Sequence, residues 1–180
     1  MNIANKITFL RIFLIPVFLL FLLVDILPYA RYIAIAVFTI ASLTDALDGY
    51  IARSKNLVTN FGKFLDSIAD KMLVCAALIA LVELGLIQAW VVIIIVSRDF
   101  ILSAFRMIAS SSNVVIAADK FGKIKTILQM VMIIYLMFMF NQPFLLTIGN
   151  ILITIVLILT ILSAINYIVK NISVLRLENI

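Results

Sequence analysis

Four aspartates between long apolar segments are the residues of this sequence best suited to chemistry. Asp45 and Asp48 are three residues apart, and Asp66 and Asp70 are four apart. Residues at these spacings share one face of a helix, so two packed helices would bring the four carboxylates to one pocket. Carboxylates repel one another strongly in a low dielectric medium. The spacing therefore predicts bound divalent cations, and all-oxygen ligands favour Mg²⁺, Mn²⁺ or Ca²⁺ over zinc or copper.

The elements that position these aspartates are predicted to be helices in a membrane. Of the 180 residues, 66% are hydrophobic, which excludes an ordinary soluble domain. A helix needs about 20 apolar residues to cross a bilayer, and six such crossings use most of the chain. We therefore predict an all-α membrane protein, with residues 1–180 as a single domain and a short N-terminal interfacial or helix-entry segment at 3–12. The six predicted spans are about 9–27, 32–50, 62–84, 88–109, 124–140 and 145–168.

The charge pattern predicts an orientation and a class of partner. The net charge of +5 suggests contact with anionic lipid headgroups or phosphorylated substrates, whereas nucleic acid is a poor partner because the basic residues are scattered among the spans. All of the 14 lysines and arginines except Arg31 fall at the termini or around the second-to-third and fourth-to-fifth connections. The positive-inside rule then places both termini and the aspartates at the cytoplasmic face of a plasma membrane.

The aspartates belong to a longer pattern, D-x2-D-G-x2-A-R-x8-G-x3-D-x3-D, which resembles the signature of the CDP-alcohol phosphotransferases. Its eight fixed positions are Asp45, Asp48, Gly49, Ala52, Arg53, Gly62, Asp66 and Asp70. The alternative is that these charges only orient a helix bundle. Because charged residues are costly at a membrane, however, a functional role is the expected reason for their presence. The resemblance implies that a CDP-linked lipid is attacked by an alcohol and that CMP leaves.

The same resemblance implies roles for the motif residues. The four aspartates would hold two divalent cations, Mg²⁺ or Mn²⁺, with Asp70 also acting as general base toward the attacking hydroxyl. Gly49, Ala52 and Gly62 would let the cytidine and ribose approach closely, and Arg53 would bind the pyrophosphate. At the N-terminus, Asn5, Thr8 and Arg11 recur at every third residue. They would either line this CDP-lipid pocket or anchor the helix at the interface.

Further along the chain, the segments around Arg98, Arg106 and Gly122–Thr126 resemble those of the bacterial phosphatidylglycerophosphate synthases. The resemblance implies a location in the bacterial cell membrane. That likeness implies CDP-diacylglycerol and glycerol 3-phosphate as substrates, membrane lipids as surroundings, and a homodimer. A phosphorylated acceptor requires cations; the candidates are Arg98, Arg106, Lys120, Lys123 and Lys125. The alternative for the lysines is positive-inside anchoring, and for Asp99 we predict an internal ion pair.

Two other functions remain open from the sequence. A sibling enzyme would use another acceptor, such as serine, inositol phosphate or phosphatidylglycerol. A small cation transporter would use the aspartates to bind the transported ion. The motif glycines and Arg53 argue against transport, because a cation path gains nothing from an arginine in its acidic site.

Overall fold

The computed structural model describes residues 3–24, 26–54, 60–111, 120–139 and 145–171, with side chains omitted for 3–7, 45–54, 60–67, 108, 110–111 and 120. In these ranges the chain forms six α-helices and no strand, in agreement with the predicted all-α class. Each helix overlaps one predicted span. The helices are α1 (Ile3–Leu23), α2 (Ala30–Ser54), α3 (Asn60–Glu83), α4 (Ala89–Ser111), α5 (Lys120–Phe138) and α6 (Leu146–Lys170).

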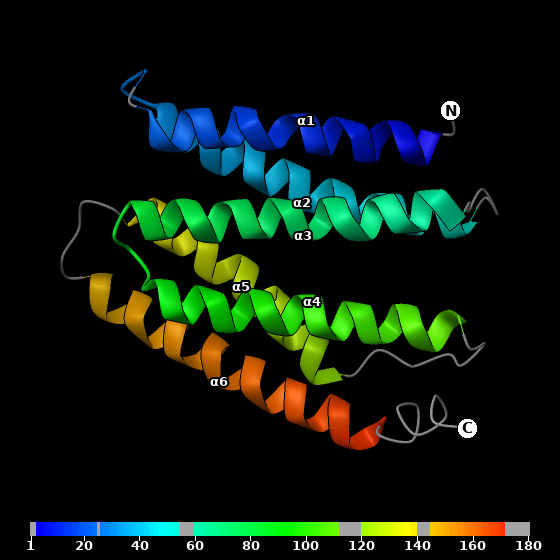
Figure 1. Ribbon diagram of the computed structural model, residues 1–180. Coiled ribbons are helices and arrows are strands. Elements are labelled where there is room, and N and C mark those ends of the chain that lie inside the picture. The colour runs from blue at the N-terminus through cyan, green and yellow to red at the C-terminus, as the bar shows by residue number, and fades with distance from the viewer. Residues whose placement is uncertain (1–2, 25, 55–59, 112–119, 140–144, 172–180) are drawn as a thin grey trace. The chain divides into compact units, whose positions relative to one another are not determined.

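The helices group into two compact units, one of Met1–Leu86 with Leu136–Phe140 and the other of Ile87–Tyr135 with Asn141–Ile180. In the first unit α1 packs against both α2 and α3, and α2 also contacts α3 (Figure 1). Phe18 of α1 and Phe38 of α2 are fully buried, with ring centroids 5.6 Å apart. Aromatic burial of this kind is a major source of packing energy between helices.

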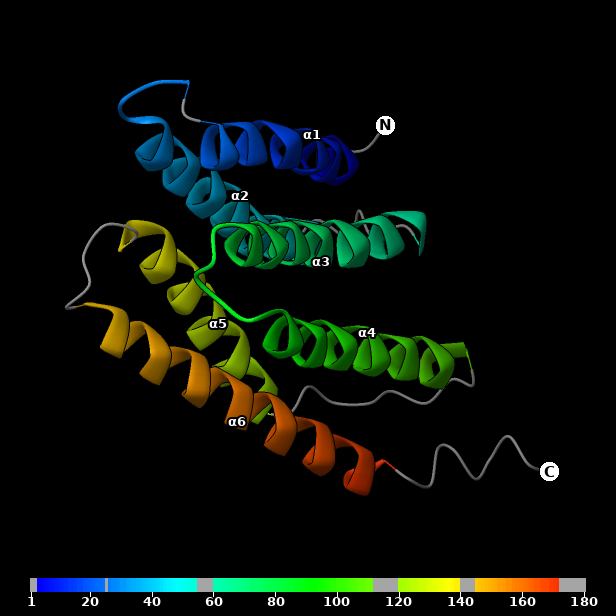
Figure 2. The ribbon, with the colours of Figure 1, turned by 60° about the vertical axis from the view of Figure 1, so that its left-hand side comes forward.

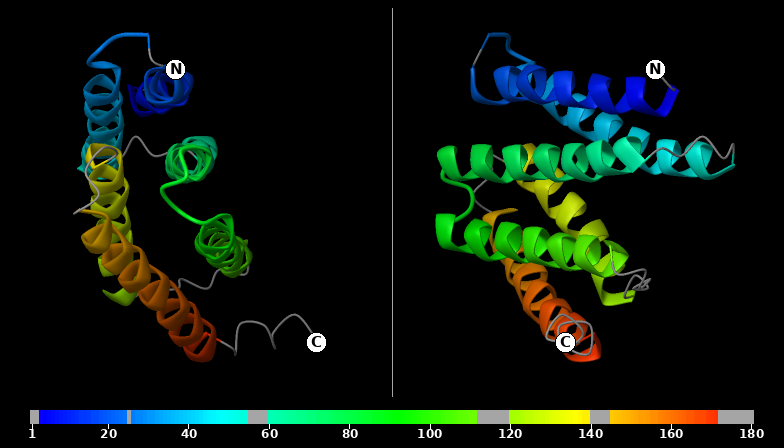
Figure 3. Two further views of the ribbon diagram at one scale, coloured as in Figure 1. Left: turned by 90° about the vertical axis from the view of Figure 1, so that its left-hand side faces the viewer. Right: turned by 45° about the vertical axis from the view of Figure 1, so that its right-hand side comes forward.

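One end of the first unit collects the positions of the aspartate motif. Asp45 and Asp48 lie in the last turns of α2, and Asp66 and Asp70 lie in the first three turns of α3. The carboxyl end of α2, the amino end of α3 and the amino end of α1 all lie at this same end (Figures 1 and 3). The predicted apolar entry and first span are therefore one continuous helix, α1, whose first turns lie at the motif end.

The opposite end of α3 is closed by a glycine. Gly85 has a φ of +69°, a left-handed conformation that glycine adopts without steric cost. The Leu86 amide donates to the Leu81 carbonyl and the Gly85 amide to the Val82 carbonyl, both at 2.9 Å. This is a Schellman motif, which satisfies carbonyls left free at a helix end.

The second unit contains α4, α6 and most of α5, and its helices are joined by polar as well as apolar contacts. The rings of Phe105 and Tyr167 meet edge to face between the packed helices α4 and α6, with centroids 6.5 Å apart. Figure 2 shows the alternating directions, with α4 and α6 running one way and α5 the other.

The buried and exposed faces of α6 are reversed relative to a helix of a water-soluble protein. The buried residues of α6 include Gly149, Thr160, Ser163 and Tyr167, whereas its exposed residues are large and apolar, with Val169 66% exposed. Helix α5 shows this reversal only in its first half, where Lys125 and Gln129 are buried and Ile127 is exposed; in its second half Met132, Ile133 and Met137 are buried. A soluble helix turns its apolar stripe inward. Small and polar residues inside with apolar residues outside are instead typical of helices surrounded by lipid.

Two helices of the described residues are long and apolar enough to cross a membrane, at Phe121–Phe138 and Leu146–Lys170. Shorter apolar helical segments occur at Thr8–Leu23 and Ala30–Thr44. Together with the exposed apolar faces of α5 and α6, these lengths indicate a helical membrane protein.

Candidate functional site

The structure places the motif aspartates on two packed helices. Helix α2 is unbroken through Asp45 and Asp48, and α3 is unbroken through Asp66 and Asp70, so the predicted helical spacing of each pair is present. The Asp70 side chain is partly buried and has an interaction partner. The side chains of the other predicted CDP-lipid and metal residues lie outside the described part of the chain: Asn5, Asp45, Asp48, Gly49, Ala52, Arg53, Gly62 and Asp66.

The amino-terminal polar residues face inward. Thr8 is 3% exposed and Arg11 is 1% exposed, and neither is without an interaction partner. Phe9, Leu10 and Phe13 of the same turns are exposed. These two side chains therefore belong to the interior of the first unit, at its motif end. Burying an arginine costs several kcal/mol unless it is paired, which agrees with the interaction partner of Arg11.

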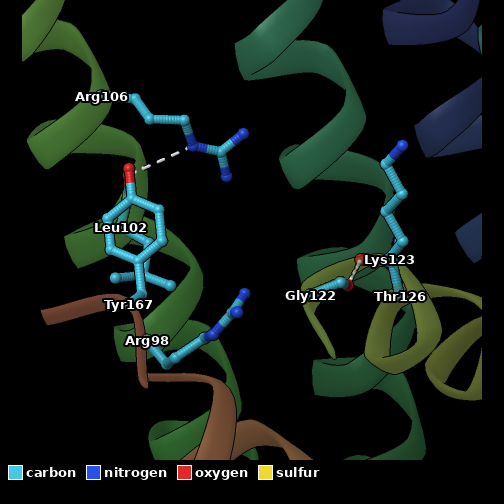
Figure 4. A pocket seen from close by; sticks show the side chains of 7 residues that line it. All are labelled: Arg98, Leu102, Arg106, Gly122, Lys123, Thr126 and Tyr167. Atoms are coloured by element: carbon cyan, nitrogen blue, oxygen red, sulfur yellow. Dashed lines mark hydrogen bonds between the residues drawn. The ribbon is translucent and has the colours of Figure 1, made fainter. Parts of the chain in front are cut away.

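The second unit contains a pocket of about 140 Å³ between its three helices (Figure 4). We call it the basic pocket. Three cationic side chains line it, and none of the described lining residues is acidic. Its residues are Arg98, Leu102 and Arg106 of α4, Gly122, Lys123 and Thr126 of α5, and Tyr167 of α6.

The basic pocket is electrostatically suited to an anion. Lys123 lies in the first turn of α5, which begins at Lys120 and has no acidic residue in that turn. A helix amino terminus carries a partial positive charge and free amide groups. A lysine at that position is unfavourable by itself and becomes favourable when an anion binds. The charge distribution of the basic pocket therefore favours a phosphate or a carboxylate as its ligand.

Arg98 is held by its own helix, α4, and by the neighbouring α6. Its Nη1 donates to the Asp99 carboxylate at 2.9 Å, and its Nη2 donates to the Ser163 hydroxyl of α6 at 2.8 Å. Arg106 has a looser attachment, with Nε 3.4 Å from the Leu102 carbonyl oxygen, and its side chain is exposed. Of the two arginines of the pocket, Arg98 is therefore held more tightly than Arg106.

Lys125 is directed away from the basic pocket and onto Asp99. Its Nζ lies 2.6 Å and 2.7 Å from the two carboxylate oxygens, and the lysine is 1% exposed. The internal ion pair predicted for Asp99 is thereby confirmed. The predicted phosphate-binding role of Lys125 stays a prediction, with its charge already paired. The Lys120 side chain lies outside the described residues.

Tyr167 is a pocket residue that the sequence analysis missed. It is 4% exposed, and its buried hydroxyl lies beside the Arg106 guanidinium but makes no hydrogen bond of normal length and angle among the described residues. Leaving a buried hydroxyl unpaired costs about 1–3 kcal/mol, and a bound ligand would supply the partner. Thr160, Ser163 and Tyr167 recur at three- and four-residue spacing in an apolar helix. That polar stripe is the signal that would have found it.

The signature residues and the helical architecture define a class of enzyme. The chain matches the CDP-alcohol phosphatidyltransferase family over residues 1–162, and it belongs to that family. Its curated relatives narrow the likeness. It is 41% identical to the CDP-diacylglycerol–glycerol-3-phosphate 3-phosphatidyltransferase of Bacillus subtilis (strain 168), over 99% of both chains.

Two other relatives carry the same or a matching name. The enzyme of Rickettsia bellii with the Bacillus name is 40% identical over 72% of this chain and 71% of its own. A probable phosphatidylglycerophosphate synthase of Mycobacterium tuberculosis is 42% identical over 73% of this chain and 64% of its own. These likenesses agree with the family predicted from the aspartate signature.

Proposed function

We propose that this protein transfers the phosphatidyl group of CDP-diacylglycerol to glycerol 3-phosphate. The names of its relatives support both substrates. The structural observation that carries the proposal is the basic pocket, in which Arg98, Arg106 and Lys123 surround one space. Glycerol 3-phosphate carries about two negative charges near neutral pH, by analogy with phosphate monoesters. An uncharged acceptor would have no use for this excess of cations.

The donor lipid is assigned to the motif end of the first unit. There Asp45, Asp48, Asp66 and Asp70 would hold two divalent cations, Mg²⁺ or Mn²⁺. Four carboxylates on two packed helices are a hard oxygen donor set that suits these ions. When bound, the ions neutralise the pyrophosphate and stabilise the leaving CMP oxygen.

Other residues of that end would shape the CDP-lipid site. Gly49, Ala52 and Gly62 leave room for the nucleoside, Arg53 binds the pyrophosphate, and the amino-terminal Asn5 and Thr8 complete the wall. The burial of Thr8 and Arg11 supports this assignment over interfacial anchoring.

The reaction exchanges one phosphorus–oxygen bond for another. The acceptor hydroxyl oxygen bonds to the phosphorus of the phosphatidyl group, the bond to the CMP oxygen breaks, and Asp70 takes the hydroxyl proton. Transfer of this type depends chiefly on positioning and charge neutralisation. Arg98, Arg106 and Lys123 supply the positioning by binding the acceptor phosphate, with Lys120 and Lys125 as further candidates and the Tyr167 hydroxyl as a neutral donor.

The proposed setting is the bacterial plasma membrane, with six spans and the motif at the cytoplasmic face. The reversed burial of α6 and the exposed apolar side chains of α5 support a lipid environment, and the distribution of basic residues supports the orientation. A homodimer is proposed from the family resemblance.

A purified-protein assay tests the function. The protein in mixed micelles or nanodiscs receives CDP-diacylglycerol, Mg²⁺ and one acceptor at a time: glycerol 3-phosphate, inositol phosphate, serine or phosphatidylglycerol. We expect CMP release and a phosphatidylglycerophosphate product with glycerol 3-phosphate alone. Faster turnover with another acceptor would replace the proposed substrate, and no CMP release with any acceptor would refute the enzyme class.

A further inference from the structure

The Arg98 guanidinium is attached to protein on both of its terminal nitrogens. Nη1 donates to Asp99 at 2.9 Å, and Nη2 donates to Ser163 at 2.8 Å. Ser163 is 1% exposed, and its hydroxyl donates to the Thr160 carbonyl at 3.0 Å. Because the hydroxyl proton is used in this bond, the Ser163 oxygen acts as the acceptor of the hydrogen bond from Arg98.

This attachment is not one that helix geometry supplies by itself. Consecutive residues do not face each other on a helix, so the Arg98 and Asp99 side chains must bend toward each other to meet, and each also bonds a different neighbouring helix. Asp99 is fixed by Lys125 of α5, and Ser163 is fixed in α6. The guanidinium is therefore oriented by groups from all three helices of the unit.

The donor count of Arg98 leaves capacity for a ligand. A guanidinium has five N–H donors in a rigid plane, and the bonds to Asp99 and Ser163 use one on each terminal nitrogen. The buried Nε has no partner among the described residues. An arginine whose plane is already fixed loses less conformational entropy when it binds phosphate.

We propose that Ser163 and Asp99 are positioning residues for the acceptor site, holding the Arg98 guanidinium in the orientation that binds an anionic phosphate. The inference rests on the proposed function and adds residues that act through Arg98 rather than on the substrate. Ser163 is the more useful to test, because Asp99 also pairs with the buried Lys125.

The chain offers a closely matched control on the same helix. Ser163 and Thr160 are both buried on α6, and each donates its hydroxyl to a carbonyl of the preceding turn. Only Ser163 also accepts from Arg98. Ser163→Ala should raise the KM for glycerol 3-phosphate about fivefold, with kcat and the KM for CDP-diacylglycerol within about twofold of wild type. Thr160→Val should leave all three within about twofold.

Two further variants separate positioning from structure. Ser163→Thr retains the hydroxyl and should restore the acceptor KM. In an Arg98→Met background, Ser163→Ala should add no further change, because residues that act through one group are non-additive.

The outcomes distinguish this inference from the proposed function. The wild-type protein must release CMP with glycerol 3-phosphate in the same assay; if it does not, the proposed function fails and this inference fails with it. With wild-type turnover present, equal effects of Ser163→Ala and Thr160→Val would overturn the inference alone. So would an effect of Ser163→Ala that persists without Arg98.

Discussion

The buried Lys125 ammonium and the partly exposed Asp99 carboxylate form an ion pair between α5 and α4, with Nζ 2.6 Å and 2.7 Å from the two carboxylate oxygens. Asp99 also accepts from Arg98 of the basic pocket. One carboxylate thus neutralises a buried lysine and also holds an arginine that lines the basic pocket. The contact that packs α5 against α4 is therefore also a contact that fixes a pocket residue.

The ion pair predicts a rescue experiment. Asp99→Asn leaves the Lys125 charge buried without its carboxylate and should destabilise the protein by on the order of 3 kcal/mol. The double change Asp99→Asn with Lys125→Met removes both charges and should recover most of the thermal stability in detergent. If the double variant is no more stable than Asp99→Asn, the buried charge is not the cause of the loss.

The aspartate cluster predicts a requirement for metal. Activity should vanish with EDTA and return with Mg²⁺ or Mn²⁺, since the proposed cluster of four carboxylates would require hard divalent ions. CMP release is measured after chelation and after each metal is added back. Full turnover in metal-free buffer would refute the two-cation site.

The motif also predicts different roles for two aspartates, with Asp66 as a metal ligand and Asp70 as the general base. Asp66→Asn should weaken the binding of metal and CDP-diacylglycerol together. Asp70→Asn should lower kcat by at least about a hundredfold, the size expected for loss of a general base, with a smaller effect on CDP-diacylglycerol binding. Near wild-type turnover in Asp70→Asn would mean that another group accepts the proton.

The cations of the basic pocket predict selective loss of acceptor affinity. Arg106→Ala and Lys123→Ala should each raise the KM for glycerol 3-phosphate by at least about tenfold, as expected for one charged hydrogen bond of roughly 1.5–3 kcal/mol. The KM for CDP-diacylglycerol should change much less. Lys170→Ala is a control, because Lys170 lies at the end of α6 and does not line the pocket. Equal losses for both substrates would indicate a folding defect.

Tyr167 predicts a change that weakens binding without weakening the fold. Tyr167→Phe removes a buried hydroxyl that has no partner of normal geometry among the described residues, so the melting temperature without ligand should be unchanged or higher. The KM for glycerol 3-phosphate should rise about threefold or more, and the stabilisation by added glycerol 3-phosphate should diminish. A lower melting temperature with an unchanged acceptor KM would assign the hydroxyl a structural role.

The sequence predicted the six helices because apolar segments near membrane length are a strong signal. Its details were also correct where local chemistry decides them. The described helices α3 (Asn60–Glu83) and α4 (Ala89–Ser111) begin and end within two residues of the spans predicted at about 62–84 and 88–109. The continuity of α1 through residues 3–12 was less clear from the sequence, because polar residues early in an apolar segment suit an interfacial entry equally well.

The basic pocket was harder to predict, because spacing along the chain does not show which partner a charged side chain contacts. Lys123 and Lys125 are two residues apart, yet one lines the pocket and the other is buried on Asp99. Ser163 and Tyr167 belong to an apolar helix in which single polar residues carry little signal. Their partners come from α4, 65 residues away in the case of Arg98 and Ser163, so only the tertiary structure brings them together.

The reversed burial of α6 has a consequence for how this unit can vary. In water, an apolar stripe determines the rotation of a helix about its own axis, but in hydrocarbon an isoleucine gains little by turning inward. The rotation of α6 is then set by the few inward groups that make directional contacts, Ser163 with Arg98 and Tyr167 with Phe105. Two of these groups, Arg98 and Tyr167, also line the basic pocket. A substitution of either residue therefore changes both the lining of the pocket and a contact that sets the rotation of α6.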